Sequence, residues 1–120
     1  MQEEDPRLLI KRVLNATDKL LSERFGVLTP EQSTHLQTVK RSAEQFELLV
    51  TYADDTASTN ARKFLAYETR ETLATVLGYT EMMGEGMFGM MNADQLQQLF
   101  AIRAQGKMLL VWLDDLLTTV

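Results

Sequence analysis

Apolar side chains recur with steps of three and four residues along most of the 120-residue chain. One series comprises Leu36, Val39, Ala43, Phe46, Val50, Ala53 and Ala57. A second series comprises Leu99, Ile102, Gly106, Leu109, Leu113, Leu116 and Val120. Such steps line one stripe of an α-helix, whereas a strand would alternate at every second residue. No stretch sustains that alternation, so the pattern predicts an all-α protein.

Capping signals set the expected helix boundaries. Pro6 and Pro30 each follow an Asp or a Thr, which is the order of an N-cap and a first helical residue. Thr29 with Gln32, and Asn92 with Gln95, have the spacing of a capping box. These signals predict four helices, at about 6–24, 30–56, 60–84 and 93–118.

The two apolar series are offset by a constant 63 residues, which indicates an internal repeat. The same offset relates identical residues elsewhere, namely Arg7/Arg70, Val13/Val76, Leu14/Leu77, Thr17/Thr80, Phe25/Phe88, Gly26/Gly89, Gln32/Gln95 and Leu36/Leu99. We interpret the repeat as two tandem antiparallel hairpins, about 5–57 and 61–120, joined by a polar link. A lone hairpin would leave an apolar face in water, so the two are expected to pack into a single four-helix bundle over residues 1–120.

Composition restricts the classes of function. With 12 basic and 17 acidic side chains, the formal net charge is −5, which argues against nucleic acid as a partner. The chain has no cysteine and one histidine, His35, so disulfides, thiolate metal sites and sites with two imidazoles are excluded. The N-terminus is acidic where a signal peptide is basic, and the apolar run 108–113 is too short to span a bilayer. We therefore expect a cytoplasmic protein without membrane insertion, cofactor or metal.

Residues 64–79, FLAYETRETLATVLGY, and 102–117, IRAQGKMLLVWLDDLL, carry a resemblance to a known family. They resemble the two helices of the dimerisation and phosphoacceptor domain of sensor histidine kinases. Residues 28–32 and 39–46 of the first hairpin are similar to the second of these helices, so the resemblance covers nearly the whole chain as two copies. It implies a bundle in which the first hairpin takes the place of a second kinase protomer.

The chain departs from the family pattern at the position that carries the activity. Tyr67 falls where the phosphoacceptor histidine is expected, and Thr72 falls where the family has proline. The 120 residues also leave no room for the ATP-binding domain of the family. The resemblance therefore implies a non-catalytic interaction module of two-component signalling, a pseudo-kinase bundle. It would bind a response-regulator receiver domain or a sensor kinase, as a monomer or a homodimer.

In the resembling family, receiver domains dock on the bundle beside the phosphoacceptor. The matching surface here is expected on the exposed flank of the third helix near Tyr67, Arg70 and Ala74. The start of the fourth helix, around Leu96 and Phe100, is expected to lie close by. Phe100 follows a stripe position, so it is either partly exposed or packed against the first hairpin.

Two other functions stay open on the sequence alone. His35 lies beside stripe residue Leu36, and a partly exposed imidazole there would suit a histidine phosphotransfer protein, although we favour its interpretation as a polar residue on the helix flank. The chain would also serve as a structural fragment of a larger sensor.

Two clusters of side chains have both structural and functional interpretations. One is a group of methionines, Met82, Met83, Met87, Met90 and Met91. This group suits the packed end of a bundle, an adaptable docking surface or a thioether copper site. The other is the pair Asp114 and Asp115, which point about 100° apart on a helix and so do not converge on one ion. Trp112 is expected in the core or on a bundle flank.

Overall fold

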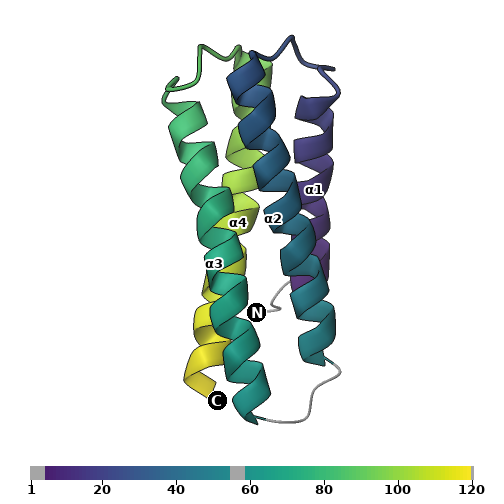
Figure 1. The fold of residues 1–120 in the computed structure, drawn as a ribbon, viewed down its shortest axis with the longest axis vertical. Coiled ribbons are helices and arrows are strands. Elements are labelled where there is room, and N and C mark those ends of the chain that lie inside the picture. The colour runs from purple at the N-terminus through teal and green to yellow at the C-terminus, as the bar shows by residue number, and fades with distance from the viewer. Residues whose placement is uncertain (1–4, 55–58, 120) are drawn as a thin grey trace.

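The computed structural model describes residues 5–54 and 59–119, and every regular element within them is a helix. These are α1 (Pro6–Leu21), α2 (Pro30–Asp54), α3 (Thr59–Gly84) and α4 (Ala93–Thr119). The four helices lie side by side in a body of 45 × 29 × 21 Å (Figure 1). The predicted all-α class and four-helix bundle are confirmed.

Each helix of the bundle contacts two neighbours. α1 packs against α2 and α4, and α3 packs against the same two helices. The antiparallel hairpins α1–α2 and α3–α4 therefore lie face to face, with α2 beside α3 and α1 beside α4 (Figure 1). This is the predicted arrangement of two tandem hairpins.

The apolar stripes predicted from the three-and-four spacing form the core. The buried stripe residues of α2 and α4 are Leu36, Val39, Ala43, Phe46, Val50, Leu99, Ile102, Leu109 and Leu113. The rest of the core comes from α1 and α3, through Leu9, Ile10, Val13, Leu20, Ala66, Leu73, Val76 and Met83. Stripe positions Ala57 and Val120, and the side chains of Ala53 and Leu116, lie outside the described residues.

The repeat of 63 residues extends to the turns after α1 and α3. These helices end at the equivalent residues Leu21 and Gly84, and the following turns place Glu23 and Gly86 at positive φ, 61° and 84°. The Glu23 carboxylate accepts a hydrogen bond from the Leu28 backbone N–H at 2.8 Å, which closes the first turn. The predicted end of α1 at residue 24 is therefore wrong, because the chain turns at Glu23.

The first predicted capping box forms and extends into the loop of the other hairpin. The Thr29 N–H donates to Gln32 Oε1 at 2.8 Å, and the Gln32 N–H donates to Thr29 Oγ1 at 3.1 Å. Thr29 Oγ1 then donates to the Phe88 carbonyl at 2.9 Å, and Gln32 Nε2 donates to the Gly89 carbonyl at 3.0 Å. One box thus caps α2 and holds the loop before α4.

The second capping box caps α4 and forms equivalent hydrogen bonds to the loop of the first hairpin. The Asn92 N–H donates to Gln95 Oε1 at 2.9 Å, and the Gln95 N–H donates to Asn92 Oδ1 at 2.8 Å. Asn92 Nδ2 donates to the Phe25 carbonyl at 2.7 Å, and Gln95 Nε2 lies 3.4 Å from the Val27 carbonyl oxygen. The two hairpins therefore interlock at their loop end through hydrogen bonds related by a pseudo-two-fold axis.

Candidate functional site

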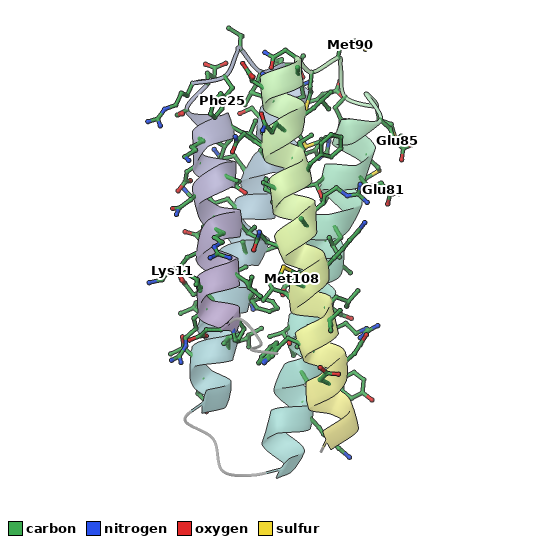
Figure 2. All side chains as sticks on the ribbon, turned by 180° about the vertical axis from the view of Figure 1, so that it is seen from behind. Lys11, Phe25, Glu81, Glu85, Met90 and Met108 are labelled. Atoms are coloured by element: carbon green, nitrogen blue, oxygen red, sulfur yellow. The ribbon has the colours of Figure 1, made fainter. Side chains whose placement is uncertain are left out.

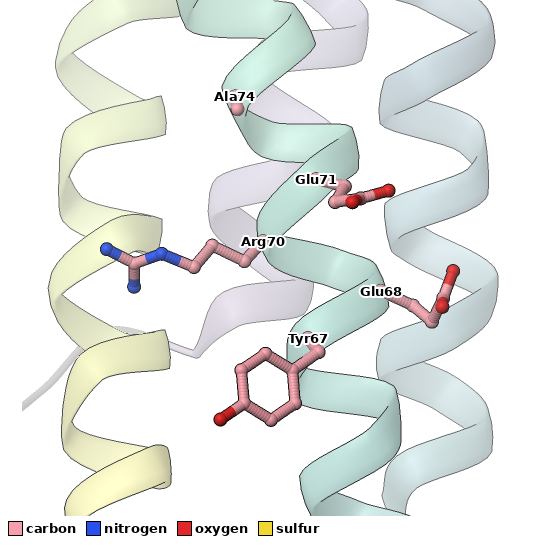
Figure 3. Close-up of a pocket in the computed structure, with 5 residues that line it drawn as sticks. All are labelled: Tyr67, Glu68, Arg70, Glu71 and Ala74. Carbon is pink, nitrogen blue, oxygen red and sulfur yellow. The ribbon is translucent and has the colours of Figure 1, made fainter.

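The predicted docking residues of the third helix lie on the outer surface of α3. Tyr67, Arg70 and Ala74 line a shallow open depression of about 320 Å³ together with Glu68 and Glu71 (Figure 3). Tyr67 and Arg70 extend towards α4, and the two glutamates point towards α2 (Figure 3). Because all five side chains come from one helix, the depression suits a docking contact better than an enclosed catalytic site.

An ion pair between Arg70 and Asp114 shows how α3 and α4 are aligned. Arg70 Nη1 donates to Asp114 Oδ1, and both side chains are about half exposed. Farther along, a Cβ placed on Gly106 would lie 2.8 Å from Leu77 Cδ2. Residues of α3 and α4 whose numbers sum to about 184 therefore lie level in this antiparallel pair. By that rule Phe100 lies level with the end of α3.

This alignment separates the predicted residues into two groups. At about 1.5 Å per residue, the level of Phe100 is roughly 15 Å along the bundle from Ala74 and roughly 25 Å from Tyr67. The expectation that Leu96 and Phe100 lie close to Tyr67 is therefore wrong. Antiparallel pairing brings the start of α4 to the loop end of α3, away from Tyr67.

Both groups nevertheless lie on one outer face of the α3–α4 hairpin. Leu96 precedes Asp114 by 114 − 96 = 18 residues, or five turns, so it shares the flank of α4 that faces α3. Phe100 is turned about 40° farther outwards and is 59% exposed, while Tyr67 is 64% exposed. We call Tyr67, Arg70, Ala74, Leu96 and Phe100 the α3–α4 face.

Two cations on the same flank are not among the residues predicted from the sequence. Arg103 and Lys107 precede Asp114 by 11 and 7 residues, which places them within about 20° of it around α4. Arg103 is half-buried, and its Nε has no hydrogen-bond acceptor among the described residues. With Arg70, they place three positive charges on this flank, beside the one negative charge of Asp114.

The repeat supplies an internal comparison for the α3–α4 face. The two apolar residues that α4 contributes to this face have polar counterparts 63 residues earlier, on α2, and the pairs are Leu96/Ser33 and Phe100/Gln37. Both hairpins contribute the same stripe pattern to the core, so packing alone does not call for an exposed phenylalanine at position 100. Comparing the surface positions of the two repeats in the sequence would have identified these apolar residues in the second hairpin.

His35 lies elsewhere, at the contact between α2 and α3. Its ring is half-buried, with its centroid 4.8 Å from that of Tyr79 and 4.0 Å from that of Phe88. Two aromatic rings therefore cover much of the imidazole, as they would for a side chain with a packing role. The counterparts of His35 and Tyr79 across the repeat are Gln98 and Ala16, so this stack has no second copy.

Trp112 and Asp114, two other candidate side chains, make contacts within the bundle. Trp112 packs edge-on against Phe46, with ring centroids 6.4 Å apart. Asp114 is engaged by Arg70. Across residues 5–54 and 59–119, no group of three His, Asp or Glu side chains is placed to hold a metal ion. Within the same ranges, every helix is too short or too polar to cross a membrane.

Comparison with known proteins leaves the family unassigned: no family model matches the sequence, and no curated protein or solved structure is significantly similar to it.

Proposed function

We propose that this protein is a non-catalytic interaction module of two-component signalling whose α3–α4 face binds a receiver domain. The composition of the face carries the proposal. Tyr67 and Phe100 are exposed aromatic residues, and Arg70 lies between them along the bundle. Exposed aromatic and arginine side chains are the residues most enriched at protein interfaces and in their hot spots.

The charge and extent of the face also suit such a partner. Arg70, Arg103 and Lys107 would complement an acidic surface. Tyr67 and Phe100 are separated by roughly 25 Å along the bundle, which is comparable to the width of an interface that buries about 800 Å² per partner.

The construction of the bundle supports binding without phosphoryl transfer. The α1–α2 hairpin completes the core that a second protomer would complete in a kinase dimer. At the position expected for the phosphoacceptor, Tyr67 offers a phenol in place of an imidazole nitrogen. The depression beside it is open and lined from one helix only.

Titration of the full chain with isolated receiver domains, followed by calorimetry, tests the proposal. Arg70→Glu and Phe100→Ala should each weaken binding about thirtyfold, equivalent to about 2 kcal/mol. Gln37→Ala, at the position equivalent to Phe100, should leave binding unchanged. Far-ultraviolet circular dichroism should show the same helix content in every variant. Normal binding by both α3–α4 variants, or unfolding of Phe100→Ala, contradicts the proposal.

A charge exchange separates direct contact by Arg70 from support of the fold. The double variant Arg70→Glu/Asp114→Arg retains an ion pair between α3 and α4 but reverses its direction. If Arg70 contacts the partner, the double variant binds as weakly as Arg70→Glu. If it recovers the original affinity, Arg70 acts only by holding the helices together.

The same receiver domains discriminate the alternative functions. After incubation with a phosphorylated receiver, the chain should remain unlabelled. Label that appears on the chain and disappears in His35→Ala would establish a phosphotransfer protein instead. Failure of every receiver domain and sensor kinase to bind would favour a structural module.

A further inference from the structure

Both hairpin loops expose large apolar side chains at the same end of the bundle, shown at the top of Figures 1 and 2. Val27 is 84% exposed and Met90, its counterpart 63 residues later, is 91% exposed. Met87 in the second loop is 63% exposed. We call Val27, Met87 and Met90 the loop-end patch. None of the three is part of the buried core.

The backbone beneath the patch is tied to the interlocked capping boxes. The Val27 carbonyl faces Gln95 Nε2 and the Met90 carbonyl faces Gln32 Nε2, each at 3.4 Å. Gln32 and Gln95 are themselves buried. The apolar side chains thus project from a fixed support, and a preorganised surface loses less conformational entropy when it binds.

The charge around the patch is almost entirely negative. Segments 22–35 and 81–97 contain one arginine and five carboxylates, a net charge of 1 − 5 = −4 out of −5 for the whole chain. All six side chains belong to exposed residues. They are Arg24, Glu23, Glu31, Glu81, Glu85 and Asp94, of which Glu85 and Glu81 are seen below Met90 on the same side of the bundle in Figure 2.

An apolar centre with an acidic surround complements a segment that has one apolar and one basic face. Opposite charges steer such a segment to the surface, and apolar side chains then supply the contact area. Flexible methionine side chains adapt to partners of different shape. The same negative charge repels a surface of anionic lipid.

We propose that the loop-end patch binds a basic amphipathic helix of a partner protein. This surface is separate from the α3–α4 face and does not depend on the receiver-domain proposal. The contact would be centred on Met90 and Val27, where the two hairpins meet, with the carboxylates at its rim.

Binding of a synthetic helix built from leucine and lysine, with leucines at helical spacing, tests this inference on the full chain. Fluorescence anisotropy should detect binding that weakens with added salt. Met90→Asp and Val27→Asp should each weaken it at least tenfold, as loss of an interface anchor does. The matched control is Leu48→Asp on α2, which changes a side chain 72% exposed far from the loops and should have no effect. Circular dichroism confirms that each variant is folded.

Four results would overturn the inference. One is equal binding by all three variants, and another is equal binding of a peptide with the same residues in scrambled order, which would show attraction by charge alone. A third is co-sedimentation with phosphatidylglycerol vesicles that Met90→Asp abolishes. The fourth is a concentration-dependent dimer that Met90→Asp dissociates, which would make a second copy the occupant. The affinity of Met90→Asp for receiver domains should equal that of the original protein. That measurement tests the α3–α4 face separately from the loop-end patch.

Discussion

Gln32 is the most deeply buried of the four capping-box residues at the loop end. Gln32 is 1% exposed. Its amide accepts from the Thr29 N–H at 2.8 Å and donates to the Gly89 carbonyl at 3.0 Å, with a longer contact of 3.4 Å to the Met90 carbonyl. Gln32→Leu keeps a side chain of similar size but removes both the acceptor and the donor.

The two short hydrogen bonds set the expected loss of stability. A part-buried backbone group left without a partner costs about 1–3 kcal/mol. Because water can reach the loops from one side, we take the lower half of that range for each group, which gives about 2–4 kcal/mol for Gln32→Leu. Gln95 makes one short bond, to the Asn92 N–H, and one contact of 3.4 Å, to the Val27 carbonyl. Gln95→Leu should therefore cost about half as much.

Urea unfolding followed by circular dichroism measures both losses of stability. The slope of unfolding free energy against urea concentration should be the same in each variant as in the original protein, which shows that the midpoints can be compared. Gln37→Leu, at an exposed position on the same helix, is the control and should change stability by less than about 0.5 kcal/mol. If Gln32→Leu matches the original protein, or if Gln95→Leu is the more damaging change, the bonds between hairpins do not contribute as argued.

The remaining predictions use the same unfolding measurement. Phe46→Ala empties the centre of the core, since Phe46 is 1% exposed, and should cost about 4 kcal/mol. Gly26→Ala should cost about 2 kcal/mol, because Gly26 has φ of +143° and a Cβ there would lie 2.6 Å from Asn92 Nδ2. Gly78 has open space around it, so Gly78→Ala should stabilise α3 by about 1 kcal/mol. The hydrogen bond from the Arg7 backbone N–H lowers the pKa of Asp5 below its usual 3.8. This stabilisation is present above pH 3.8 and is lost as the pH falls through the lowered pKa, so the gap in stability between the original protein and Asp5→Ala should close in acid.

The helices and their stripes were predictable because their causes are local. A capping box needs two residues three apart, and both Thr29–Gln32 and Asn92–Gln95 form as expected. The end of α1 was missed because a glutamate takes the left-handed conformation at position 23, where glycine is the usual signal. Gly86 supplies that signal at the equivalent position in the second hairpin.

Contacts between the hairpins could not be read from local patterns. The bonds from Gln32 and Asn92 to the opposite loops join residues more than 50 positions apart in sequence, and so does the pairing of His35 with Phe88. The separation of Tyr67 from Phe100 follows from the alignment of α3 with α4, which the ion pair of Arg70 with Asp114 marks. The spacing of residues along one helix predicts which face they share. Their positions along the bundle axis, relative to residues of a neighbouring helix, depend on how the two helices pair.

The two surfaces proposed for binding differ in their relation to the pseudo-two-fold axis. Binding at each surface should therefore depend differently on how the two hairpins pack. Phe100 has Gln37 as its counterpart, so the α3–α4 face occurs once per chain and a partner there contacts one hairpin. Val27 and Met90 are counterparts of each other, and each is held by a glutamine of the opposite hairpin. A partner at the loop end therefore contacts both hairpins together, and its binding would stabilise their packing by mass action. Loss of the crossed bonds in Gln32→Leu should then weaken loop-end binding while leaving the α3–α4 face unchanged.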